Sequence, residues 1–165
     1  MKPTSMTPWT VRCLTPAEVD LAASVFGAAL NASRVRILAI PFWRRAFAAG
    51  GSLIVWPAQL APGDFSTACP SAQSELIHEL THAWQAQIGV NLILAKLRAG
   101  DGPGAYDYAL GCDSDFGSFN IEQQAMILQH AFLAARSQPA PFPGERYAAV
   151  LASTPFAGAL SPLAA

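Results

Sequence analysis

Residues 71–84, Ser71-Ala72-Gln73-Ser74-Glu75-Leu76-Ile77-His78-Glu79-Leu80-Thr81-His82-Ala83-Trp84, contain two of the three histidines of this 165-residue chain. Ser and Gln residues of the helix-capping type lead into the segment, and its apolar residues recur at helical spacing. Gly89 follows as the expected stop signal. The sequence therefore predicts a helix of about 16 residues with the pattern HExxH inside it.

The HExxH pattern matters because of where a helix places its three polar residues. A four-residue step brings His78 and His82 onto one face, about 6 Å apart along the axis, so both imidazoles can reach one metal ion. Glu79 lies roughly 100° around the helix from His78, where a carboxylate can take a proton from a metal-bound water. The alternative, a structural helix that carries the pattern by chance, is disfavoured by the helical context. The motif predicts two zinc ligands and one general base.

A catalytic zinc ion has three protein ligands and one open position, so one ligand has to come from elsewhere in the chain. Glu122 is the first candidate, because it begins a predicted helix that can pack against the motif helix, and the helix dipole favours its ionised form. Asp113 and Asp115, in the loop before it, are alternatives, as is His130. Since His130 lies about 12 Å along the helix from Glu122, these two residues cannot bind the same ion.

The motif region resembles a known type of zinc peptidase. Residues 76–85, LIHELTHAWQ, followed by residues 120–125, NIEQQA, are similar to the gluzincins. Within that type the chain resembles the compact bacterial metallopeptidases called Vgr-related, akin to peptidase-like domains associated with contractile injection systems. The likeness covers residues 14–133. It implies a zinc cofactor with His78, His82 and Glu122 as ligands and Glu79 as general base.

One departure from the gluzincin pattern concerns the residues that orient the histidines. The helix after Glu122 has no acidic residue three or four positions on, where larger gluzincins often support a histidine. The resemblance therefore leaves the hydrogen-bond partners of the two imidazoles unassigned.

The predicted fold is α+β: a minimal zincin-like domain with the HExxH helix, a second ligand-bearing helix and a small sheet. The expected elements are a helix at 16–30, strands at 35–40 and 52–56, the motif helix, a strand at 105–110 and a helix from 121 to about 135. Residues 1–136 are expected to form the domain. Residues 137–165 are expected to be a proline-rich C-terminal extension, packed on the domain or tailing from it.

The expected reaction is metal-assisted hydrolysis of a peptide bond, in which Glu79 takes a proton from water and passes it to the leaving amine. Tyr106 and Tyr108 lie on one side of the strand expected at 105–110 and are candidates for stabilising the oxyanion, although a packed aromatic face is the plainer interpretation. The strand at 52–56 is expected at a sheet edge, where it can hold an extended substrate by main-chain pairing.

Two other functions remain open at the level of the sequence. The first is a zinc-stabilised pseudo-peptidase or binding module of a secretion or injection apparatus, favoured by the small size and low charge of the chain. The second is a zinc amidase, because the same activation of water serves both chemistries. The sequence does not identify the peptide or protein substrate.

Composition narrows the class of partner. Hydrophobic residues make up 52% of the chain, charged residues 13%, and the net charge is −1. Such a chain lacks the basic field that nucleic-acid binding requires, so no nucleic-acid partner is expected. Prolines 155 and 162 interrupt the apolar tail, so no membrane span is expected.

The N-terminus and the cysteines bear on the compartment. Residues 1–8 lack the apolar segment of a secretory signal, which predicts a cytoplasmic protein, with export by a non-classical apparatus as an open alternative. Cys13, Cys69 and Cys112 are odd in number and have no CxxC spacing, which favours a reducing compartment. One bridge between Cys69 and Cys112 remains an alternative.

Overall fold

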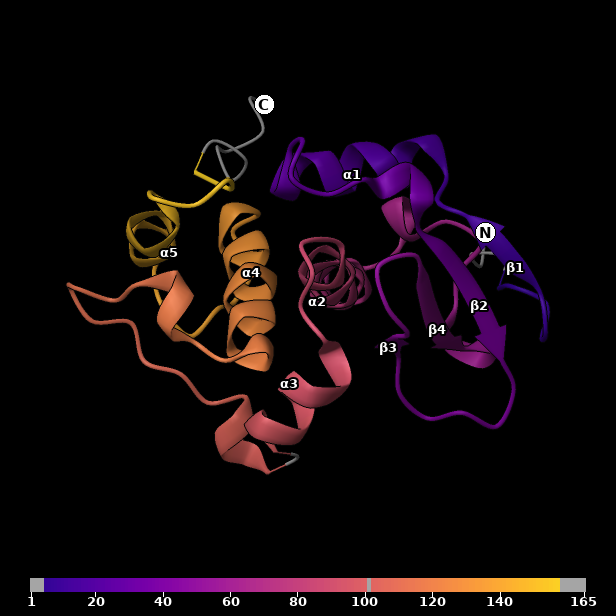
Figure 1. The fold of residues 1–165 in the computed structure, drawn as a ribbon. Coiled ribbons are helices and arrows are strands. Elements are labelled where there is room, and N and C mark those ends of the chain that lie inside the picture. Colours follow the sequence, from indigo (N-terminus) through magenta and orange to yellow (C-terminus); the bar gives the residue numbers. More distant parts are fainter. Residues whose placement is uncertain (1–4, 101, 158–165) are drawn as a thin grey trace.

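The computed structural model of this chain describes residues 5–100 and 102–157, which adopt the predicted α+β fold (Figure 1). Within these ranges the α-helices are α1 (Pro16–Phe26), α2 (Pro70–Gln87), α3 (Leu92–Ala99), α4 (Ile121–Ala135) and α5 (Gly144–Leu151). The strands are β1 (Val11–Cys13), β2 (Arg36–Ile40), β3 (Phe47–Ala48) and β4 (Leu53–Pro57). In Figure 1 the sheet lies on one side of α2, and α4 and α5 lie on the other.

The four strands form one mixed sheet in the order β1-β2-β4-β3. β2 and β4 are parallel, with Ile37 opposite Ile54 and Ala39 opposite Trp56. These four residues are buried on one face of the sheet because side chains alternate between faces at every second position. The expected edge position of residues 52–56 is wrong: β4 pairs with β2 on one side and β3 on the other, so the edge strands are β1 and β3.

α2 runs through the centre of the molecule. It begins at Pro70, where the missing N–H costs nothing because the first helical N–H groups have no partner within the helix. Leu76, Ile77, Leu80 and Ala83 are fully buried in the core, so α2 contributes an apolar face around which the other elements pack. α4 packs against α2, and α5 packs against α4. The motif helix is thus held from both sides.

The predicted strand at 105–110 is wrong. Residues 103–105 form a short 3-10 turn, and the backbone N–H groups of Tyr106 and Asp107 both donate to the carbonyl of Pro103. Side chains at the start of α4 take the carbonyls that a neighbouring strand would have taken: Asn120 donates to Ala105 and Gln123 donates to Asp107. The segment is therefore anchored to α4 and joins no sheet.

α1 is shorter than the predicted helix at 16–30, because it ends at Phe26. Gly27 adopts a φ of +51°, a left-handed value that glycine tolerates and that ends the helix. α3, β1 and β3 were not predicted at all.

The C-terminal segment packs on the domain through α5. Tyr147, Val150 and Leu151 of this helix are buried in the core next to α4. Within the described ranges, none of the helices has the length and apolar character needed to cross a bilayer. Pro162 and the rest of the tail from residue 158 lie outside the described residues.

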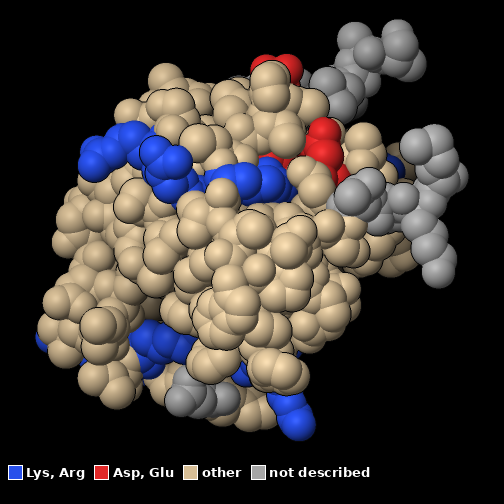
Figure 2. All heavy atoms as spheres, turned by 90° about the vertical axis from the view of Figure 1, so that its right-hand side faces the viewer, with Lys and Arg blue, Asp and Glu red and all other residues tan. Residues whose placement is uncertain are grey.

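The low share of charged residues is visible on the surface, and the three cysteines are not bridged. Figure 2 shows that the face on the sheet side is largely uncharged, with Lys and Arg gathered in separate patches. Cys13, Cys69 and Cys112 are all exposed and free, so the alternative bridge between Cys69 and Cys112 is absent.

Candidate metal centre

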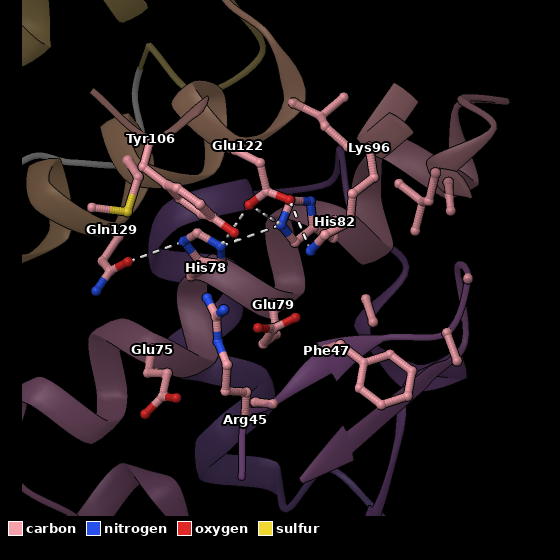
Figure 3. Close-up of a pocket in the computed structure, with 18 of the residues that line it drawn as sticks. Arg45, Phe47, Glu75, His78, Glu79, His82, Lys96, Tyr106, Glu122 and Gln129 are labelled. Carbon is pink, nitrogen blue, oxygen red and sulfur yellow. Dashed lines mark hydrogen bonds and ion pairs between the residues drawn. The ribbon is translucent and has the colours of Figure 1, made fainter. Parts of the chain in front are cut away.

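Three ligand atoms from two helices converge in one place (Figure 3). α2 supplies His78 and His82, whose Nε2 atoms lie 3.2 Å apart. α4 supplies Glu122, whose Oε2 lies 3.3 Å from Nε2 of His82 and 3.5 Å from Nε2 of His78. The ligand atoms of the three residues all lie within 4.8 Å of one another, close enough to share one ion.

The charges of this cluster are strongly coupled. Burial by itself would raise the pKa of Glu122, but hydrogen bonds from His78 and His82 and the charge of Lys96 hold that pKa well below its usual range. Burial alone would lower the pKa of His82, yet its hydrogen bond with Glu122 and the negative charge of Glu79 raise it above the usual value. The site therefore favours an ionised carboxylate and a positive charge, from a proton or a metal ion, beside it.

Hydrogen bonds to the outer nitrogen of each imidazole orient the rings. Nδ1 of His82 lies 2.8 Å from Oε1 of Gln85, and Nδ1 of His78 lies 3.0 Å from Oε1 of Gln129. With Nδ1 engaged, each ring turns its Nε2 toward Glu122. The partners that the sequence left unassigned are thus two glutamines, one on the motif helix and one on α4.

The residues present fit a zinc ion. Two imidazole nitrogens and one carboxylate oxygen form the ligand set of many catalytic zinc sites. Glu79, only 6% exposed, lies below the two histidines in Figure 3 and lines the same cavity. Its Oε2 is buried and has no hydrogen-bond partner among the described residues. A buried, unpaired carboxylate oxygen beside three ligand atoms is where a water molecule on a metal ion would be received.

The cluster opens into a cavity of about 1210 Å³. Most of its wall comes from α2, α3, α4, and β3 with the segment just before it. Tyr106 lines this cavity, and its side chain points toward His78 and Glu122 in Figure 3. A space of this size can receive a peptide segment across the three ligands.

The structure places Tyr108 elsewhere. It is absent from the cavity wall, and its hydroxyl is hydrogen-bonded to Nδ1 of His130 at 2.7 Å and to the hydroxyl of Tyr147 at 3.0 Å. Burial and the bond with Tyr147 raise the pKa of Tyr108, so its hydroxyl stays protonated. Of the two predicted tyrosines, the structure therefore brings Tyr106 to the ligands.

The alternative third ligands also lie outside the cluster. Within the described part of the chain, the group that holds His78 and His82 contains Glu122 and includes neither Asp113, Asp115 nor His130. His130 has Tyr108 as its neighbour, and burial, aided by the charge of His78, lowers its pKa.

Sequence reasoning missed Lys96, which lies on α3. Its Nζ is 3.2 Å from Oε1 of Glu122, so the carboxylate is shared between a cation on one oxygen and the imidazoles on the other. A local signal for α3 was present: the side chain of Asn91 accepts the N–H of Leu94 as an N-cap, ahead of the sequence LILAKL.

Comparison with known proteins places the chain in a family. No protein-family model matches it. Over 156 residues, 87% of this chain, the sequence is 30% identical to the type VI secretion system spike protein VgrG2b of Pseudomonas aeruginosa, and the match spans only 15% of that protein. The solved effector domain of the same VgrG2b aligns with a TM-score of 0.69 at 30% identity, covering 90% of this chain and 86% of the domain. The chain therefore belongs to the family of the VgrG2b effector domain.

Proposed function

We propose that this chain is a zinc-dependent hydrolase of peptide bonds. The observation that carries the proposal is the convergence of His78, His82 and Glu122 within 4.8 Å of one another, beside the unpaired carboxylate oxygen of Glu79. Structural zinc sites are closed by four protein ligands, whereas three ligands beside an open cavity are typical of catalytic sites.

Each residue has a distinct role in the proposed reaction. Zinc, when bound by the two histidines and Glu122, supplies a Lewis acid that polarises a carbonyl group and acidifies water. Glu79 takes the proton from that water and delivers it to the leaving amine. Tyr106, whose side chain points toward the ligands, donates its hydroxyl hydrogen to the oxyanion without adding charge.

We propose that β3 binds the main chain of the substrate. It is the edge strand that lines the cavity, and among the described residues one side of its main chain pairs with no other strand, so it can pair with an extended peptide. Ala46, Ala48 and Ala49 have small side chains, which lets a peptide approach the ligands on α2 closely.

The family supports a setting for this activity. Its members include the effector domain of a type VI spike protein, and that spike is much longer than this chain. We propose that the chain is the effector part of such an apparatus and leaves the cell through it.

The test compares two glutamates on the same helix. Glu79→Gln should abolish cleavage of a peptide library while the protein keeps stoichiometric zinc, measured by metal analysis, because the amide cannot accept the proton. Glu75→Gln is the matched control: Glu75 lines the same cavity one turn earlier, is exposed, and should keep most of the activity. Retained cleavage in Glu79→Gln would sink the proposed role of Glu79.

A second candidate is a zinc-stabilised binding module of the same apparatus, which is favoured by the spike protein to which the chain is related. In that case zinc removal should unfold the domain, and Glu79→Gln should leave binding to the spike intact. A wild-type protein that binds zinc but cleaves no member of a broad peptide library would support this candidate. Cleavage of non-peptide amides alone would indicate an amidase.

A further inference from the structure

His82 is the first member of a chain of hydrogen bonds that ends on the backbone. Its Nδ1 lies 2.8 Å from Oε1 of Gln85, and Nε2 of Gln85 donates to Oε1 of Gln124 at 2.9 Å. Nε2 of Gln124 in turn donates to the carbonyl oxygens of Phe116 and Phe119, at 3.2 and 3.1 Å. Two glutamine side chains thus connect a candidate zinc ligand to two main-chain carbonyl groups.

The carbonyl groups at the end of this hydrogen-bond series decide which group donates at each step, because a carbonyl oxygen can accept hydrogen bonds but cannot donate them. Gln124 must therefore turn its NH2 group to the carbonyls and its oxygen to Gln85. Gln85, which is 1% exposed and also donates to the carbonyl of Ile121 at 3.1 Å, must turn its own oxygen to His82. A flipped Gln85 would place its oxygen against two other oxygen atoms. The proton of neutral His82 is thereby held on Nδ1.

His78 is held by a second chain with the same direction. The hydroxyl of Ser74 donates to the carbonyl of Ser71 at 2.9 Å, so its oxygen is left to accept from Nε2 of Gln129, at 3.5 Å. The oxygen of Gln129 therefore faces Nδ1 of His78, at 3.0 Å. The hydrogen bond between Gln129 and Ser74 is long, so this series holds His78 more weakly than the first series holds His82.

We infer that Gln85 and Gln124, and on the other side Gln129 and Ser74, are positioning residues that set the tautomer of the two histidines. With the protons on Nδ1, the Nε2 lone pairs of both rings face Oε2 of Glu122, which is the form a metal ion requires. The inference rests on the proposed zinc site. It also explains how the site works without the acidic partner that larger gluzincins use: the direction of amide hydrogen bonds replaces the charge of a carboxylate.

The first experiment reads the tautomers without metal. Nitrogen-15 NMR of the metal-free full chain should show Nδ1 of both site histidines carrying a proton throughout the pH range in which the chain is folded, because each Nδ1 faces an amide oxygen. In Gln85→Leu Nδ1 of His82 loses its acceptor, so the proton of the neutral ring should move to Nε2, beside Glu122, while His78 keeps its state. Wild-type protein in which Nδ1 of His82 carries no proton would overturn the inference.

The second experiment measures zinc affinity by competition with a chelator. Gln85→Leu should weaken zinc binding by about 10- to 100-fold, the usual effect of losing a partner of a metal-bound histidine. Gln87→Leu is the matched control, because Gln87 lies two residues further along α2, bonds the backbone of Asn31 and Gly51, and has no link to the site. It should change zinc affinity by less than about twofold, because only the partners of a metal ligand act on the metal.

Gln85→Leu and Gln124→Leu act through one chain, so their effects should not add. The double variant should bind zinc within about twofold of Gln85→Leu alone. Additive losses, or equal losses in Gln85→Leu and Gln87→Leu, would mean that these amides only support the fold. Wild-type protein that binds no zinc would refute the proposed function, and the tautomer of His82 would still decide the inference by itself.

Discussion

Nζ of Lys96 lies 3.2 Å from Oε1 of Glu122, which ties α3 to α4 across the mouth of the candidate metal centre. α3 has no buried residue of its own, and three of its apolar side chains are exposed: Ile93 (78%), Leu94 (44%) and Leu97 (76%). The side chain of Lys96 is 48% exposed, so solvent screens this ion pair and its effect on global stability is small.

Lys96→Met should therefore loosen α3 locally and leave the rest of the fold intact. Hydrogen exchange of the α3 amides should become several-fold faster, while the free energy of unfolding falls by less than about 1 kcal/mol. Arg98→Met, on the same helix, serves as the control and should leave exchange unchanged. Equal exchange in both variants would show that the ion pair does not hold α3.

The choice of third ligand can be tested by metal analysis alone. Glu122→Ala removes the carboxylate that lies 3.3 Å from His82 and should lower zinc affinity by at least about 100-fold, because two imidazoles remain. Asp113→Ala and Asp115→Ala should bind zinc as the wild type does. Loss of zinc in either aspartate variant would point to a different ligand set.

The two tyrosines should behave differently in kinetics. Tyr106→Phe removes a hydroxyl beside the ligands and should lower kcat on the order of 100-fold, as loss of an oxyanion donor does, with little change in stability. Tyr108→Phe removes the hydrogen bonds to His130 and Tyr147 and should cost about 1 kcal/mol of stability with kcat unchanged. Urea unfolding and steady-state kinetics on both variants separate the two effects.

Glu18 should be among the most sensitive positions for stability. Its fully buried carboxylate accepts two hydrogen bonds from Arg12, at 2.6 and 2.7 Å, and one each from the backbone N–H groups of Thr15 and Phe65. Glu18→Ala leaves the charge of Arg12 without its partner and should lower the free energy of unfolding by about 3–5 kcal/mol. Denaturant unfolding measures this loss.

Glu145→Ala, at an exposed carboxylate of α5, is the control for Glu18→Ala and should change stability by no more than about 0.5 kcal/mol. A loss of similar size in both variants would contradict the importance of the buried network.

His130 makes the stability of the fold depend on pH. Burial and the charge of His78 lower its pKa from the usual 6.5, so the folded state favours the neutral ring. The contribution of neutral His130 to the free energy of unfolding is complete above pH 6.5. It declines as the pH falls toward the lower pKa of the folded state, by at most about 1.4 kcal/mol per pH unit. Thermal unfolding of metal-free wild type and His130→Gln should show a steeper decline below pH 6.5 in the wild type, because the other titrating groups are the same in both proteins.

The local part of the fold follows from the sequence because its signals lie within a few residues of each other. Thr15 and Glu18 form the capping box that starts α1, and Asn120 and Gln123 form the one that starts α4. In the same way, the four-residue step between His78 and His82 sets their common helix face through hydrogen bonds inside one helix. Neighbouring residues are sufficient to predict these features, and the structure contains the helices that were predicted from them.

Features that join distant segments were predicted poorly or not at all. The strand expected around Tyr106 is absent because Asn120 and Gln123 take its backbone carbonyls, an interaction that no local pattern in residues 105–110 reveals. Which strand forms the sheet edge depends on the pairing of β3 with β4, and β3 has only two residues.

By itself, then, the sequence determined α1, α2 and α4, the HExxH face and the residue types available for a metal site. Only the tertiary structure decided that Glu122 reaches His82, that Lys96 takes the other carboxylate oxygen, and that Gln85 orients the imidazole. The physical reason is that spacing within a helix is set by local backbone hydrogen bonds, whereas distances between helices depend on how side chains of the whole core pack.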